Sequence, residues 1–184
     1  MQSKNTMSSE QYKTQDSKIL AFLTALCLFF SAVELALPKP FPFLRLGLAN
    51  VPVILALFIL PASKFFLLIL LKIFVQNLIS GTLFSYTILF SVAGSFASAL
   101  IMFTLFKLFY KHNLISLVGI SLAGALFNSL AQLGVSYLLI FNENTKYIAP
   151  FLLASSFITG LLLGIAVTVF TERSQWFKEI QNEN

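Results

Sequence analysis

Long apolar runs separated by short polar breaks follow one another along this chain from Ile19 to Phe170. A membrane-spanning helix needs about 20 mostly apolar residues, because each residue adds about 1.5 Å to its length. The runs predict an all-α membrane protein with six transmembrane helices, over Ile19–Leu37, Leu46–Leu60, Phe65–Ser80, Leu83–Phe106, Leu114–Phe141 and Ile148–Phe170. The second and third are short. Pro52 lies near the start of the second, so we expect that helix to be kinked or broken.

The two ends of the chain differ from its middle. Residues 1–18 are polar and rich in Ser, Gln and Lys, which predicts a disordered cytoplasmic tail. We expect a transmembrane domain over residues 19–170 and a cytoplasmic C-terminal tail over residues 171–184. A cleaved signal peptide is the weaker interpretation, because the first apolar run is longer than an ordinary signal core and more spans follow it.

Basic residues are divided unevenly between the two faces of this predicted bundle. Of the 12 Lys and Arg residues, eight lie on the face that carries the N-terminus and three on the other. The positive-inside rule therefore predicts that both termini are cytoplasmic. The net charge of +5 is spread through the loops and forms no patch, which argues against nucleic-acid binding.

Lys72 lies in the middle of the third predicted span. A charged side chain at that depth costs about 2.5–3.5 kcal/mol on insertion, so it normally faces a protein interior or a wet cavity. Gln76 follows one helical turn later on the same face, and Asn77 lies at its edge. The fifth predicted span carries a polar, small-residue stripe at spacings of three and four, formed by Ser121, Gly124, Asn128, Gln132 and Ser136.

Eight polar residues fall in the middle and outer half of the membrane when they are placed by depth. They are Glu34, Arg45, Asn50, Lys72, Gln76, Asn77, Asn128 and Gln132. The cytoplasmic halves of the helices carry almost no such groups, so we expect an outward-facing pocket that binds a small molecule. Loops around residues 38–45 and 142–150 would gate it. The positive residues on that side favour an anionic or strongly polar ligand.

Structural explanations for the same residues remain open. Asn128 and Gln132 would serve equally well as interhelical hydrogen-bonding residues, worth about 0.6 kcal/mol per contact. Lys72 would be satisfied by an ion pair with Glu34, or by extending its stem toward an interface. Glu34 and Arg45, near the interface, would also be stable when solvated.

Small residues at four-residue spacing predict close helix contacts in two places. Gly160 and Gly164 form a GxxxG pair in the sixth predicted span. Ala21 and Ala25 form a similar pair in the first. Either pair is equally compatible with packing inside the bundle.

The residues that most enzymes need are missing. Asp16 is the one aspartate, and no phosphate-binding loop or GxGxxG motif is present. Cys27 and His112 each occur alone and far apart, so no Cys/His metal site can be formed. We therefore predict no catalytic residues, no metal and no cofactor. Without a nucleotide site, any transport would be passive, ion-coupled or powered by a partner.

The segment Leu44-Arg-Leu-Gly-Leu-Ala-Asn50 resembles the KLGLAN signature of the Gx transporter family, small bacterial membrane proteins often labelled heptaprenyl diphosphate synthase component I. The resemblance continues through the segments Leu71–Phe74, Ser80–Ser85, Leu117–Ala125 and Ile158–Gly164, and covers about residues 20–170. The family usually carries arginine where Lys72 stands, so a planar fork of donors is replaced by a point charge.

That family is similar to the substrate-binding S components of energy-coupling-factor transporters. The resemblance implies a six-helix bundle in the bacterial inner membrane, with a ligand pocket near the outer face. It also implies docking on a transmembrane coupling subunit with ATPases, through small residues of the first helix such as Ala21 and Ala25. The second hypothesis is a non-catalytic membrane accessory component of heptaprenyl diphosphate synthesis. A third, a scaffold without a ligand, predicts a Lys72–Glu34 pair and no cavity.

Overall fold

The computed structural model describes residues 2–36, 47–110 and 114–175, and within these ranges every regular element is a helix. The long helices are α1 (Gln2–Ala36), α3 (Ala62–Ile79), α4 (Thr87–Leu108), α5 (Leu117–Ser136) and α6 (Thr145–Arg173). The short elements are η1 (Leu48–Asn50), α2 (Val51–Ile59), η3 (Tyr137–Phe141, a π-helix) and η4 (Asn142–Asn144). The all-α prediction is confirmed for the described residues.

The second predicted span is only a half-length helix. η1 has three residues and α2 has nine, which together extend about 18 Å and cannot cross a hydrocarbon core of about 30 Å. α2 is buried among the other helices, since Val53, Ile54 and Ala56 have no exposed surface. Pro52 stands in its first turn, where proline is tolerated.

Five helices of the described chain are long and apolar enough to cross a membrane, so the prediction of six spans is confirmed only in part. These candidate spans are Asp16–Ala36, Ala62–Ile79, Thr87–Leu108, Leu117–Leu139 and Asn142–Arg173. A short broken helix inside the protein is possible because its free backbone groups are buried against neighbouring helices rather than exposed to lipid.

Two segments predicted to be irregular are helical instead. α1 begins at Gln2, so it extends through the segment predicted as a disordered tail. α6 begins at Thr145 and contains Pro150, so most of the predicted loop over residues 142–150 belongs to that helix. The domain limits at residues 18 and 171 stay predictions.

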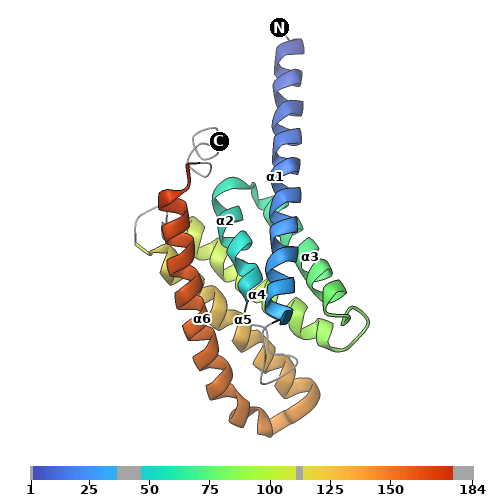
Figure 1. Cartoon of the computed structure of the whole chain (residues 1–184), viewed down its shortest axis with the longest axis vertical. Coiled ribbons are helices and arrows are strands. Elements are labelled where there is room, and N and C mark those ends of the chain that lie inside the picture. Colours follow the sequence, from blue (N-terminus) through green and yellow to red (C-terminus); the bar gives the residue numbers. More distant parts are fainter. Residues whose placement is uncertain (1, 37–46, 111–113, 176–184) are drawn as a thin grey trace.

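The helices form one bundle in which α1 packs beside α3, and α5 packs between α4 and α6. α1 begins at the upper end of Figure 1 and extends above the other helices, and α6 ends on the same side of the bundle but lower in the view. At the lower end, the α5–α6 hairpin reaches beyond the other helices (Figure 1). At the end where α6 stops, Asp16 of α1 forms an ion pair of 3.1 Å with Lys64 of α3.

α5 and α6 approach each other closely along the predicted GxxxG pair. A Cβ atom added to Gly164 would lie 2.7 Å from the Cα of Val118, and one added to Gly160 would lie 2.8 Å from the Cβ of Ala125. The Ser121 hydroxyl donates a hydrogen bond of 2.8 Å to the carbonyl of Gly160. The sequence-based prediction of close packing at this pair is therefore confirmed, and its partner is α5 of the same chain.

Candidate functional site

A carboxylate from α1 binds the turn that precedes α2. Gly47 adopts a left-handed conformation, with φ of 84°, and turns the chain into η1. The backbone N–H groups of Gly47 and Leu48 donate hydrogen bonds of 3.2 and 3.1 Å to Oε2 of Glu34. Glu34 is only 1% exposed. Its negative charge therefore lies at the positive end of the helix dipole, where an anion is stabilised.

The ammonium group of Lys72 holds the same turn from α3. Lys72 is 4% exposed, and its Nζ donates a hydrogen bond to Oδ1 of Asn50. The backbone of Asn50 closes the turn by donating to the carbonyl of Gly47 over 2.8 Å. Glu34 and Lys72 therefore hold one short segment, Gly47–Asn50, from two different helices. The alternative of a direct Glu34–Lys72 ion pair stays a prediction.

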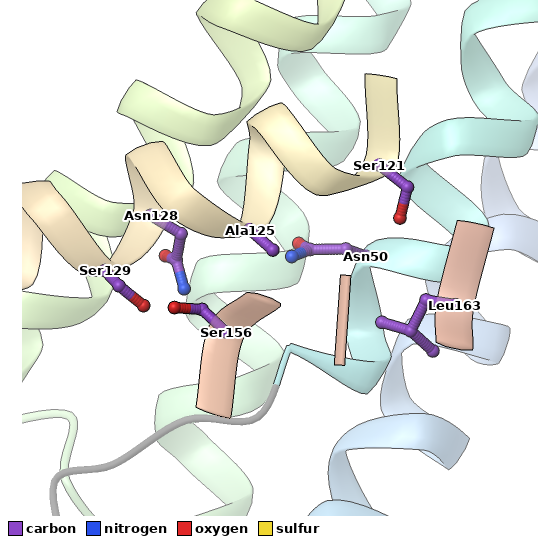
Figure 2. A pocket seen from close by; sticks show the side chains of 7 residues that line it. All are labelled: Asn50, Ser121, Ala125, Asn128, Ser129, Ser156 and Leu163. Carbon is purple, nitrogen blue, oxygen red and sulfur yellow. The ribbon is translucent and has the colours of Figure 1, made fainter. Parts of the chain in front are cut away.

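A small polar cavity lies where Asn50 meets α5 and α6. It is lined by Asn50, Ser121, Ala125, Asn128, Ser129, Ser156 and Leu163 (Figure 2). The space open to the centre of a water molecule is about 10 Å³, which is close to the room needed for one water. Two of the predicted site residues, Asn50 and Asn128, line this cavity. That it is a ligand pocket, and that it opens toward the outside, stay predictions.

The hydrogen bond from Lys72 determines which groups Asn50 offers to this cavity. An ammonium can only donate, so Asn50 must turn its oxygen toward Lys72. Its amide nitrogen then carries the two N–H donors and lies near Gly47, because a Cβ atom on Gly47 would be 3.0 Å from it. The Asn50 side chain extends toward the cavity that it lines (Figure 2). The hydroxyl protons of Ser121 and Ser156 are used on backbone carbonyls, so these two residues present acceptor lone pairs.

Asn128 and Gln132 lie on the side of α5 that faces α4. A Cβ atom on Gly94 would lie 2.2 Å from Oδ1 of Asn128 and 3.1 Å from Nε2 of Gln132. The predicted polar stripe of α5 is buried along its whole length. Its counterpart on α4 is a buried stripe that we did not predict, formed by Ser91, Gly94, Ser95 and Ser98. The spacing of three and four residues between these small residues places them on one helix face and could have predicted the stripe.

The remaining predicted site residues take other positions. Gln76 is buried on α3, one turn beyond Lys72. The side chain of Asn77 donates to the carbonyl of Ile73 over 2.7 Å and accepts from the hydroxyl of Thr82 over 3.0 Å, so it organises the end of α3.

The two predicted docking residues, Ala21 and Ala25, do not line the cavity. Ala21 and Ala25 are exposed on α1, on a different face from its buried residues Leu23 and Cys27. Arg45 lies outside the described residues, as does the predicted gating loop around it. Among the described residues, no group of three or more His, Cys, Asp or Glu side chains is placed to hold a metal ion.

Comparison with known proteins identifies the family. The family model for heptaprenyl diphosphate synthase component I matches residues 23–170. The chain belongs to this family. No curated protein and no solved structure matches it. A component I is an accessory, non-catalytic part of the synthase, which confirms that the chain is not itself an enzyme and implies a second synthase component as its partner. The similarity to S components stays a prediction.

Proposed function

We propose that this chain is the ligand-binding membrane component of a small-molecule uptake system, similar in architecture to S components. The observation that carries the proposal is the buried ammonium of Lys72, bound to an asparagine that lines a polar cavity. Charged residues at this depth commonly mark ligand or ion pathways, because burying them without a function is costly.

The donors around the cavity suit an anionic or strongly polar ligand. Asn50 brings two N–H groups and stands beside the positive charge of Lys72. Asn128 and Ser129 add further polar groups from α5. Oε2 of Glu34 already accepts hydrogen bonds from the backbone N–H groups of Gly47 and Leu48. The predicted roles of Gln76, Gln132 and Arg45 in ligand binding belong to this proposal.

A ligand larger than one water requires α2 to move away from α5 and α6. α2 is suited to such movement, because a turn at Gly47 precedes it and it spans only half a membrane. The chain would take its energy from a coupling subunit with ATPases, docked on the exposed residues Ala21 and Ala25. In this proposal both termini face the cytoplasm of a bacterial inner membrane.

Native mass spectrometry of the protein purified from its own membranes tests this function. We expect one retained small molecule in the wild type, together with a coupling subunit. The matched control is Lys64→Ala, because Lys64 lies on the same helix as Lys72 but pairs with Asp16 away from the cavity. Lys72→Ala should lose the small molecule, whereas Lys64→Ala should keep it. Equal retention in the two variants would remove Lys72 from the site.

The family match favours a second candidate, an accessory role in heptaprenyl diphosphate synthesis. The same cavity beside Lys72 would then contribute to handling a lipid or diphosphate intermediate. Membranes that contain the catalytic component, with and without this chain, distinguish the two functions. A prenyl transferase rate that depends on this chain supports the accessory role, and an unchanged rate supports uptake.

A further inference from the structure

Buried oxygen atoms without a hydrogen-bond partner mark one half of the bundle. Within the described residues, six of them belong to α4, α5 and α6: Thr87 Oγ1, Ser91 Oγ, Ser98 Oγ, Gln132 Oε1, Ser136 Oγ and Thr145 Oγ1. Thr87 opens α4, Ser136 closes α5 and Thr145 opens α6, so these three lie at the same end of the bundle. The others lie deeper, on the facing sides of α4 and α5.

The two helices meet along a polar seam, which we define as Ser91, Gly94 and Ser98 of α4 with Gln132 and Ser136 of α5. Gln132 is 2% exposed and its amide lies against Gly94, so it points at α4. A Cβ atom on Gly124 would lie 3.2 Å from the Ser98 hydroxyl, which places Ser98 against α5 one turn beyond Asn128. The unpartnered oxygens therefore follow the contact line between the two helices.

We propose that ordered water occupies this polar seam and forms a hydrated route from the Thr87–Ser136 end of the bundle to the cavity at Asn50. Hydroxyl and amide groups inside a membrane protein need partners, and buried water typically supplies about three hydrogen bonds. Asn128 joins the two parts, because its Oδ1 faces Gly94 in the seam and the residue also lines the cavity. The route is a property of α4 and α5 and holds whether or not Lys72 binds a ligand.

Silver ions test the route, because Ag⁺ travels through water, does not enter lipid and blocks thiols. Cysteines are placed at Ser91 and Ser98 in a Cys27→Ser background and reconstituted in liposomes. Phe96→Cys on α4 and Leu130→Cys on α5 are matched controls, since both are at similar depth but exposed on the bundle surface, at 38% and 48%. Thiols that remain unblocked are then counted with a fluorescent maleimide in SDS.

We expect Ag⁺ to block S91C and S98C at least about tenfold faster than either control. If Ag⁺ blocks S91C and S98C no faster than F96C and L130C, the hydrated route does not exist. If Ag⁺ blocks only S91C faster than the controls, the water does not extend as far as the cavity.

Radiolytic footprinting of the wild-type protein provides a second readout that needs no substitution. The Sδ atom of Met102 lies near Ser98, since both would be close to a Cβ atom on Gly124, and Met102 is only 1% exposed. Hydroxyl radicals formed from water in the seam should oxidise this sulfur at a rate near that of an added methionine peptide. A Met102 that stays unoxidised at doses that oxidise the peptide would overturn the proposal, even if a cysteine variant fails to fold.

Discussion

Adding one methyl group at Gly164 should separate α5 from α6. The new Cβ atom would lie 2.7 Å from the Cα of Val118 and 3.1 Å from the Cβ of Ser121. Carbon atoms pack best at about 3.5–4.0 Å, so the two backbones must move apart by roughly 1 Å. Because the first clash is with backbone, no side-chain rotation relieves it. Overpacking of this kind costs about 1–3 kcal/mol.

Gly134→Ala is the matched control for this prediction. Gly134 is on α5, and a Cβ atom there would meet nothing within 4 Å. The control should be neutral or gain about 0.5–1 kcal/mol, since alanine favours helix more than glycine does.

Unfolding in mixed micelles of increasing SDS content, followed by pulse proteolysis, measures both variants. We expect Gly164→Ala to unfold at lower SDS than the wild type, and Gly134→Ala at the same or higher SDS. Equal midpoints for the wild type and Gly164→Ala would refute the close α5–α6 contact.

The same unfolding assay tests three further changes. Glu34→Ala removes the acceptor of the Gly47 and Leu48 N–H groups and should cost about 1.5–3 kcal/mol, with a smaller loss for Glu34→Gln, which keeps one acceptor oxygen; a stable Glu34→Ala variant would show that the turn needs no anion. Ser121→Ala removes the hydrogen bond to Gly160 and should lower the free energy of unfolding by about 0.6 kcal/mol. A loss above about 1.7 kcal/mol would mean that the hydroxyl makes a further stabilising contact. Gly94→Ala places a Cβ atom 2.2 Å from Oδ1 of Asn128, which can rotate away, so stability should fall by only about 1 kcal/mol. Because Asn128 then leaves the cavity, ligand retention should fall in native mass spectrometry. Unchanged retention would show that Asn128 does not contribute to ligand binding.

The sequence was sufficient to predict the features that depend on local pattern. Apolar runs predicted the long helices, and the spacing of Asn128 and Gln132 predicted the buried polar face of α5. The short second run with Pro52 predicted a broken helix, and α2 is half-length. Length and composition alone determine these features, because lipid demands apolar surface and internal backbone hydrogen bonding.

Other features depend on contacts between distant segments and could not be predicted from local pattern. Nothing in the first span indicates that Glu34 binds the backbone of Gly47, 13 residues later. Local pattern also does not indicate that Lys72 donates a hydrogen bond to Asn50, 22 residues earlier in the chain. The α4 stripe that includes Gly94 was overlooked because serine and glycine raise no polarity signal as strong as that of asparagine.

The central claim is that Lys72, through Asn50, forms part of a ligand site. Isothermal titration of the purified protein with the ligand that native mass spectrometry identifies tests it most directly, using the wild type, Lys72→Ala and the control Lys64→Ala. Loss of a single charge-assisted contact of about 1.5–3 kcal/mol should weaken binding by Lys72→Ala by at least about tenfold. Lys64→Ala should bind like the wild type. Wild-type affinity in Lys72→Ala would contradict the claim.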